Sequence, residues 1–593
     1  MDLLQQLQGA VDPQRLQGNL EWFAGVRRDT GGPGEEAAAR YIEEQLREAG
    51  ATVRMHEFSA FLSYPREASL ELIGADGATL ESFACVTHSF AQSTPADGIV
   101  DELIYRPDGD FKDARGRTVL VDGLCTPVTV LEASRAGVKA LVFVNQGDVV
   151  HNMIATTIWG TPSEDQLDRL PTVSAVSISH PDGERLKARL QEGTNTVRLR
   201  ATVETGWYNS LLPEAIIPGS GPNREQFVLV GAHYCSWEFG ITDNATGDAC
   251  LLEVARILEA NKDRMDRSVR LCWWPGHSHG RYSGSTWYAD NFFFDLAQNC
   301  VAYHNIDSPG VRDATHYVAR HTTAEIEEFC TDLIESLTGQ DDAPVHRPSR
   351  AADQSFLANG VPAFSTYPFL PEEHPERKPW TGGCANAWWW HSSADTLDKA
   401  SVEILTLDTR ISATGIARLA NARVLPLNPQ RSAEEVLRYA EKFAKDTAGH
   451  LDASRFLAQA RELHTEAGRL ARTAANARDG EVSQEGLARI NDALMRYSRI
   501  VMPLVYSKGG RYTHDPAEWT PIMRNTRSGL FPGLAAGAAL SDLDGSDQYG
   551  FVRTGAVRQL NRAVDLLAQA TGLCRDAADA IPAGEEGVAT AAD

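Results

Sequence analysis

The sequence lacks the segments that direct a chain to a membrane or out of the cell. Its first residues, MDLLQQLQG, are polar and amphipathic, without the basic and apolar regions of a signal peptide. No later apolar run has the length that a bilayer-spanning helix needs. The nine cysteines stand singly, without CxxC spacing, and their odd number fits free thiols in a reducing compartment better than a disulfide framework. We therefore predict a cytoplasmic protein without membrane contacts.

Positive charge is also scarce. Lys and Arg total 56 against 80 Asp and Glu, which gives a formal net charge of -24. Nucleic acids and anionic membranes are bound by clustered positive charge, so this balance argues against both as partners. The apolar fraction of 42% and the charged fraction of 23% are those of an ordinary globular protein. At 593 residues the chain is too long for one hydrophobic core, which predicts three or four domains.

Composition and periodicity divide the chain into four stretches. Residues 1–64 are predicted to form the N-terminal part of the main domain, and residues 65–205 a compact β-rich module inserted into it. Residues 206–425 alternate strand and helix, the pattern of βα units around a mostly parallel or mixed sheet, and residues 426–593 are mainly helical. The fold class is therefore α/β. The strands expected in the third stretch are 227–231, 269–274, 299–306, 315–319 and 361–366.

The stretch 228–257 carries the first candidate site residues. An apolar run ends at Gly231, His233 follows it, and Asp243 lies ten residues later, directly before a helical pattern. Open α/β sheets bind their ligands where strands end and helices begin, and imidazole and carboxylate both bind borderline cations. The alternative is that Asp243 only caps the helix and that His233 is an ordinary loop residue.

Three further strand ends add residues of the same chemistry. His277 and His279 follow one expected strand, Asp307 follows another, and His391 stands just before a helical turn. Each alone is weak, because an aspartate at a strand end is commonly a cap and a single histidine is commonly structural. Together, at the carboxyl ends of one predicted sheet, they indicate a shared metal site.

The motifs that carry these residues resemble the M28 family of zinc aminopeptidases and carboxypeptidases. The resemblance is closest to the branch that contains glutamate carboxypeptidase and transferrin receptor. GAHY, TDNATG, NIDSPG and HSSADTLDK follow one another in the family's order. The insert resembles a protease-associated domain, and GGRYTHDPA and NRAVDL resemble the family's helical dimerisation domain. The resemblance therefore implies a zinc-exopeptidase-like catalytic domain and a homodimer formed through residues 430–580.

The resemblance also assigns roles to the candidate ligands. His233 and Asp307 match the terminal ligands of one metal, Asp243 matches the carboxylate that bridges two metals, and His391 matches a terminal ligand of the second. The peptide bond between Asp243 and Asn244 is typically cis in the family. The implied cofactor is a divalent metal, with zinc favoured over manganese or iron.

The chain departs from the family pattern after Gly276. Where the family has two glutamates, a general base and a metal ligand, this chain has His277 and Ser278. Cys235 also stands where the family usually has an aspartate that orients the first histidine. We expect one tightly held metal at His233, Asp243 and Asp307, with the second site weak or absent. The alternative is that His277 or His279 rebuilds the second site with nitrogen ligands.

The expected function is hydrolysis of an amide-type bond in a small-molecule or short peptide-like substrate, because the inserted module should restrict access. His277 and His279 are the catalytic candidates, and His277 takes the place of the family's general base. Two alternatives remain: a non-catalytic binding scaffold, and a metal-dependent lyase or isomerase that uses a histidine base. Four further residues are candidates for substrate contacts, with surface pairing or aromatic packing as the alternative explanation: Glu238, Arg350, Asp353 and Trp390.

Overall fold

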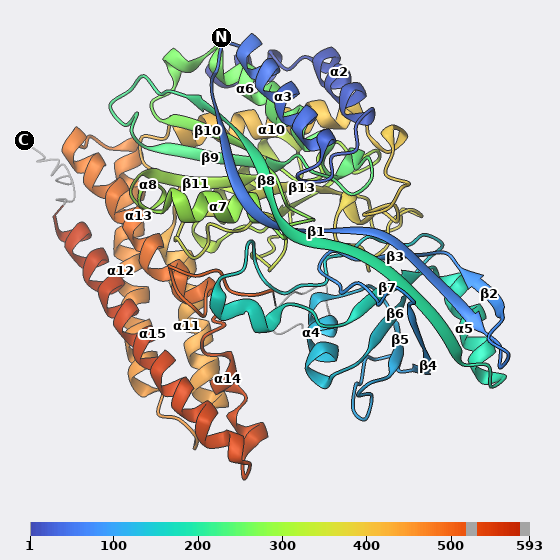
Figure 1. Ribbon diagram of the computed structural model, residues 1–593. Coiled ribbons are helices and arrows are strands. Elements are labelled where there is room, and N and C mark those ends of the chain that lie inside the picture. Colours follow the sequence, from blue (N-terminus) through green and yellow to red (C-terminus); the bar gives the residue numbers. More distant parts are fainter. Residues whose placement is uncertain (1, 518–529, 581–593) are drawn as a thin grey trace, which may run out of the picture.

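Apolar runs along the chain form one mixed 13-stranded sheet (Figure 1). The computed structural model describes residues 2–517 and 530–580. All five strands expected between residues 206 and 425 are present, with small differences at their ends. The strands are β1 Thr52–Ile73, β2 Thr79–Phe83, β3 Cys85–Thr87, β4 Ile99–Tyr105, β5 Thr118–Asp122, β6 Ala140–Val144, β7 Ser174–Ile178, β8 Thr196–Ile217, β9 Phe227–His233, β10 Ser268–Trp274, β11 Cys300–Asn305, β12 His316–Arg320 and β13 Ala363–Phe369.

The central strands bring the candidate site residues to one edge of the sheet. β9 runs parallel to both β10 and β11, and β11 runs parallel to β13. The whole of β9, FVLVGAH, is buried, as expected of a strand covered on both faces. In the register, His233 at the end of β9 faces Trp274 at the end of β10. The carboxyl ends of these strands therefore meet, as the predicted α/β arrangement requires.

Two strands of 22 residues each, β1 and β8, connect the central part of the sheet to a second module. They pair antiparallel along almost their full length, and Figure 1 shows them running together from the central strands to the smaller module. In that module β4, β5, β6 and β7 run parallel, and β3 pairs antiparallel with β7. The predicted boundaries after residues 64 and 205 lie almost opposite each other, at the pairs Tyr64–Glu204 and Ser63–Thr205.

Helices cover the sheet on both faces. Figure 1 shows α3, α6 and α10 over one face of the central strands, with α7 and α8 on the side nearest the C-terminal helices. The helices around the two sheet modules are α1 Leu3–Gly9, α2 Pro13–Ala24, α3 Pro33–Glu48, α4 Pro127–Ala136, α5 His180–Gln191, α6 Thr246–Glu259, α7 Ser283–Asn291, α8 Phe293–Asn299, α9 Glu327–Thr338 and α10 Val402–Ala420.

The C-terminal segment is helical, as predicted. It comprises α11 Pro429–Asp446, α12 Ser454–Asp479, α13 Gln484–Tyr506, α14 Ala535–Ala538 and α15 Asp547–Asp579. Of the predicted 426–593 stretch, residues 518–529 and 581–593 lie outside the described residues. The apolar faces of these helices join the core of the central sheet in one continuous hydrophobic cluster. Arg499 of α13 strengthens this junction, because its buried guanidinium donates to backbone carbonyls of Leu296 and Ala297 in α8.

Two features predicted from the sequence can be compared directly with these elements. All nine cysteines lie in the described residues, and each is a free thiol. Among the helices that the structure describes, none combines the length and the apolar character needed to cross a bilayer.

Candidate metal centre

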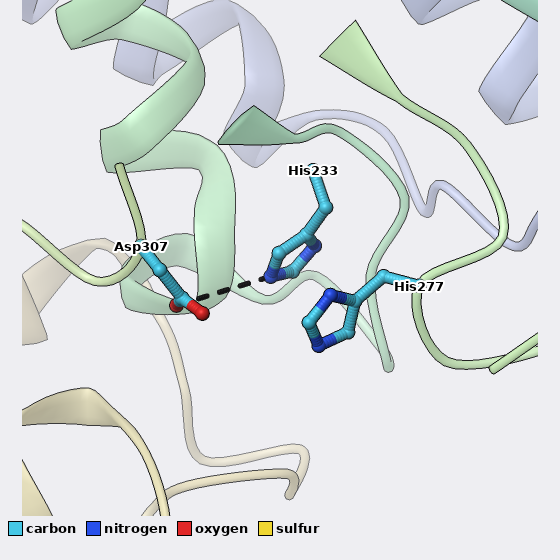
Figure 2. A group of neighbouring side chains, drawn as sticks. All are labelled: His233, His277 and Asp307. Atoms are coloured by element: carbon cyan, nitrogen blue, oxygen red, sulfur yellow. Dashed lines mark ion pairs between the residues drawn. The ribbon is translucent and has the colours of Figure 1, made fainter. Parts of the chain in front are cut away.

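Four of the predicted ligands lie at the sheet edge where β9 and β11 end. His233 is the last residue of β9, and Asp243 lies in the turn Ile241–Ala245 that leads into α6. Asp307 follows β11, and His391 lies in the loop after β13. The Nε2 atom of His233 is 3.0 Å from Oδ1 of Asp243 and 4.0 Å from Oδ1 of Asp307. Figure 2 shows the His233 and Asp307 side chains pointing toward each other, with the His277 ring beside them.

Asp243 lies between His233 and His391. Its Oδ1 faces His233, and its Oδ2 is 3.3 Å from Nε2 of His391. The peptide bond between Asp243 and Asn244 is cis, as the family resemblance implied. One carboxylate thus contacts both imidazoles with its separate oxygens, the arrangement expected of a bridging position.

Backbone hydrogen bonds fix the direction in which both histidines point. Nδ1 of His233 donates to the carbonyl of Cys235 at 2.9 Å, and Nδ1 of His391 donates to the carbonyl of Asn152 at 2.8 Å. Each ring therefore presents Nε2 to the site, in the tautomer that can donate an electron pair there. The acceptor that orients His233 is the backbone carbonyl of Cys235, not its side chain. His233 is therefore oriented although residue 235 is a cysteine and not an aspartate.

Asp395 holds the turn that carries Asp243. Its carboxylate accepts the backbone N–H groups of Thr242 and Asp243 at 2.9 Å and 3.1 Å, and the Thr242 hydroxyl at 2.8 Å. Burial raises the pKa of Asp395 to about 7, against the effect of these hydrogen bonds. Asn244 adds a second link, because its side chain accepts the Ser308 N–H at 2.9 Å and so ties this turn to the loop after β11.

The charges in the site favour a cation. Burial lowers the pKa of His233, but the nearby Asp243 carboxylate, with Asp307 beyond it, raises that pKa well above its usual value. Burial raises the pKa of Asp243, yet His233 and His391 together hold it well below its usual value. Such an ionised carboxylate attracts positive charge, which a metal ion supplies when it replaces the imidazole protons.

The donor set fits a divalent metal. His233 Nε2 is buried and has no well-aligned hydrogen-bond partner in the part of the chain that the structure describes, although two carboxylates lie close to it. One ligand atom from each of His233, His277 and Asp307 lies within 4.8 Å of the others. Convergent imidazole and carboxylate groups of this kind suit zinc and similar cations. Among the described carboxylates, only Asp243 is within ion-pair distance of His391, so a second position would have few ligands.

His277 lies against this set and has its own carboxylate partner. Its ring stacks on His233 with 3.8 Å between centroids, and its Nδ1 donates to Oδ2 of Asp353 at 2.7 Å. Ser285 donates to the other oxygen of Asp353 at 2.7 Å, and Ser285 in turn contacts Ser355 at 2.8 Å. Asp353 therefore lies behind His277, where it orients the ring. Asp353, a candidate for substrate contact from the sequence, is not among the residues that line the cavity at the candidate metal ligands.

The structure separates His279 and Glu238 from the metal ligands. The chain turns after β10, where the Gly280 N–H donates to the Gly276 carbonyl, so His277 and His279 face different cavities. His279 is buried, its pKa is lowered to about 4 by that burial, and its Nε2 lies 3.8 Å from Asp29. Glu238 forms an ion pair with Arg27 at 3.1 Å. Both line a second cavity of about 180 Å³ that contains none of the four predicted ligands.

Arg350 and Trp390 line the cavity at the candidate metal ligands. This cavity of about 90 Å³ also includes Asp243, His277, Asp307 and His391, and the Trp390 ring stacks on His391 at 3.8 Å. Several other residues of the cavity wall belong to no sequence motif, so they could not be predicted before the fold was known: Met153, Ile154, Arg281, Tyr282, Arg320, His321 and Tyr367. Two of these, Met153 and Ile154, come from the inserted module, so that module contributes to the wall of the cavity.

Comparisons with known proteins match part of this chain to one family. Residues 215–413 match the family model described as Peptidase family M28. A curated Mycobacterium tuberculosis protein named "Probable lipoprotein aminopeptidase LpqL" is 29% identical over 295 residues, 47% of this chain and 54% of that protein. "Probable glutamate carboxypeptidase VP8" of Zea mays is 24% identical over 374 residues, 52% of each chain. The chain thus spans about half the length of these two relatives.

Solved structures share the fold of the sheet domains. An aminopeptidase from Aneurinibacillus sp. strain AM-1 aligns with a TM-score of 0.54 and 22% identity, over 70% of this chain and 95% of that one. A zinc aminopeptidase from Bacillus subtilis aligns with a TM-score of 0.55 and 19% identity, over 68% of this chain and 95% of that one. At these identities the comparison confirms the mixed α/β fold predicted from the sequence.

Proposed function

Because residues 215–413 form a peptidase family M28 domain, we propose that this chain is a metal-dependent hydrolase of an amide bond in a small or short peptide-like substrate. The observation that supports this most directly is the environment of His233. Its Nε2 is buried without an aligned partner, and carboxylate oxygens of Asp243 and Asp307 approach it to 3.0 Å and 4.0 Å. A divalent ion accounts for this convergence of electron-pair donors.

We propose that one zinc ion is held by His233, Asp243 and Asp307. The chemistry that a bound zinc supplies is Lewis-acid activation of the amide carbonyl and of a water molecule. Within residues 2–517 and 530–580, His391 has only Asp243 as a carboxylate at ion-pair distance, and Ser278 offers no carboxylate where the family has its second glutamate. The second metal position is therefore weak in this proposal.

In this proposal His277 replaces the family's general base. Its Nδ1 is committed to Asp353, which leaves Nε2 as the ring nitrogen that can accept a proton from water and return it to the leaving amine. The Asp353 carboxylate fixes the ring and stabilises the imidazolium that forms, in the way that a buried aspartate supports a catalytic histidine in hydrolases. The buried hydroxyl of Ser285 holds Asp353 in turn.

Hydrolysis in oxygen-18-labelled water tests the reaction class. We expect the zinc-loaded protein to cleave members of a panel of dipeptides and N-acyl amino acids, and to place one solvent oxygen in the new carboxylate. Removal of the metal by a chelator should abolish this activity, and zinc should restore it, because the carbonyl and the water depend on the ion for activation. The control is an Asp243→Asn variant purified in the same way.

Other outcomes of the labelled-water experiment contradict hydrolysis. Exchange of a substrate proton without incorporation of solvent oxygen would indicate a lyase or isomerase. Tight metal binding with no turnover of any panel member would indicate a binding scaffold.

A further inference from the structure

Arg281 is a buried cation for which the described residues provide no counter-charge. It lies in the loop between β10 and α7, only 4% exposed. Among the described residues no carboxylate forms an ion pair with its guanidinium, and its Nε atom is buried without a hydrogen-bond partner. The Tyr282 ring lies 5.6 Å from the guanidinium carbon. Burial lowers the pKa of Arg281, but a guanidinium remains protonated in proteins, so the charge persists.

This unpaired charge faces the cavity of the metal ligands. Arg281 lines that cavity together with Asp243, His277 and Asp307. Neither aspartate compensates it, because Asp243 contacts His233 and His391, and Asp307 faces His233. Buried charges in native proteins are normally paired, and a charge that borders a cavity can obtain its partner from a ligand.

The other arginines of the cavity already have partners. Arg350 donates to Asp515 at 2.9 Å and to the Tyr506 carbonyl at 3.1 Å. Arg320 donates to the Gly382 carbonyl at 2.9 Å, and its guanidinium lies 4.6 Å from the centre of the Tyr367 ring. Both add positive charge to the cavity wall, but only Arg281 among the three has no acceptor in the described chain.

The backbone around Arg281 is also unusual. Arg281 and Tyr282 have φ values of +41° and +68°, in the left-handed region that favours glycine. Such residues persist where the surrounding structure fixes them, and they gather at functional sites. Here the Gly160 N–H donates to the Arg281 carbonyl and the Tyr282 N–H donates to the His277 carbonyl. The loop that positions His277 therefore also positions Arg281.

We propose that Arg281 binds a carboxylate of the substrate, next to the amide bond that is cleaved. The preferred substrates are then amides with a free carboxylate, such as N-acyl amino acids and dipeptides with an unblocked C-terminus. A planar guanidinium and a carboxylate form paired, charge-assisted hydrogen bonds, whereas an uncharged carboxamide leaves the buried charge uncompensated. The role of Arg281 in substrate recognition rests on the proposed hydrolase function. Binding of a carboxylate at Arg281 can be tested without turnover.

The test measures, by calorimetry, the equilibrium binding of N-acetylglycine and of N-acetylglycinamide to the metal-loaded protein. We expect the wild type to bind the carboxylate at least about tenfold more tightly than the amide. Arg281→Gln should remove this preference, and Arg281→Lys should retain part of it because the charge remains. The matched control is Arg66→Gln, which changes the net charge equally but alters an arginine that pairs with Glu204 and lies outside the metal cavity.

Three results would overturn the assignment: a wild type that binds neither compound, a wild type that binds both equally, and an Arg281→Gln variant that keeps the preference. The last would place the carboxylate on the metal instead. Metal content is measured for each variant alongside binding. Carboxylate-selective binding without hydrolysis would support the carboxylate site at Arg281 and would contradict the proposed hydrolase function.

Discussion

Replacement of His277 by alanine is expected to lower kcat by about 10²- to 10⁴-fold, the usual contribution of a positioned general base. The metal content should stay at the wild-type level, because in our proposal the ion is held by His233, Asp243 and Asp307. The measurement pairs kcat, on a substrate found in the labelled-water panel, with elemental analysis of the same preparation. Asp353→Asn should change kcat in the same direction, since the amide that replaces the carboxylate no longer stabilises the imidazolium.

His450→Ala is the matched control for the His277 variant. His450 is a half-buried histidine whose Nδ1 lies 3.1 Å from the Tyr549 hydroxyl, and it does not line the metal cavity. Its replacement should leave both kcat and metal content unchanged. Loss of the metal in His277→Ala would contradict the base assignment and would make His277 a ligand, a role that its distance to His233 and Asp307 also permits.

Replacement of Arg499 by methionine is expected to lower the free energy of unfolding by about 3–5 kcal/mol. Its guanidinium is buried, which lowers its pKa to about 10, and it donates to carbonyls of Leu296, Ala297, Cys300 and Gly360. Methionine fills the space but leaves these carbonyls without that donor, at the junction of α13 with the central sheet domain. The measurement is the urea midpoint, together with the rate at which limited proteolysis releases the C-terminal helices.

Arg496→Met provides the comparison on the same helix. Arg496 is exposed and, among the residues described, its one ion pair is with Asp492, so its replacement should change stability by less than about 1 kcal/mol. Equal midpoints and equal proteolysis rates for the two variants would show that the buried guanidinium does not hold the helical segment to the sheet.

The convergence of the metal ligands could be predicted from the sequence, because it depends on local pattern. The buried run before His233 and the strand before Asp307 each have the periodicity of a strand in a parallel sheet, and the carboxyl ends of neighbouring parallel strands meet. The strand assignments needed only these local signals and the flanking helical patterns. The four candidate ligands could therefore be placed near one another together with the elements that carry them.

Other parts of the site depend on contacts between distant residues and could not be predicted. Asp353 reaches His277 across 76 positions of sequence, and the Asn152 carbonyl reaches His391 across 239. His277 and His279 are two residues apart, and only the turn after β10 determines that they face different cavities. Arg281 has no motif of its own, since its role follows from burial without a partner, which is a property of the folded chain.

Elemental analysis of the purified wild type beside a His233→Ala variant tests the central proposal most directly. We expect one zinc per chain in the wild type and none above background in the variant, because His233 Nε2 lies at the centre of the donor set. A wild type without stoichiometric metal would contradict the metal-dependent hydrolase. Two metals per chain would contradict the single site and would show that the histidines after β10 rebuild the second position.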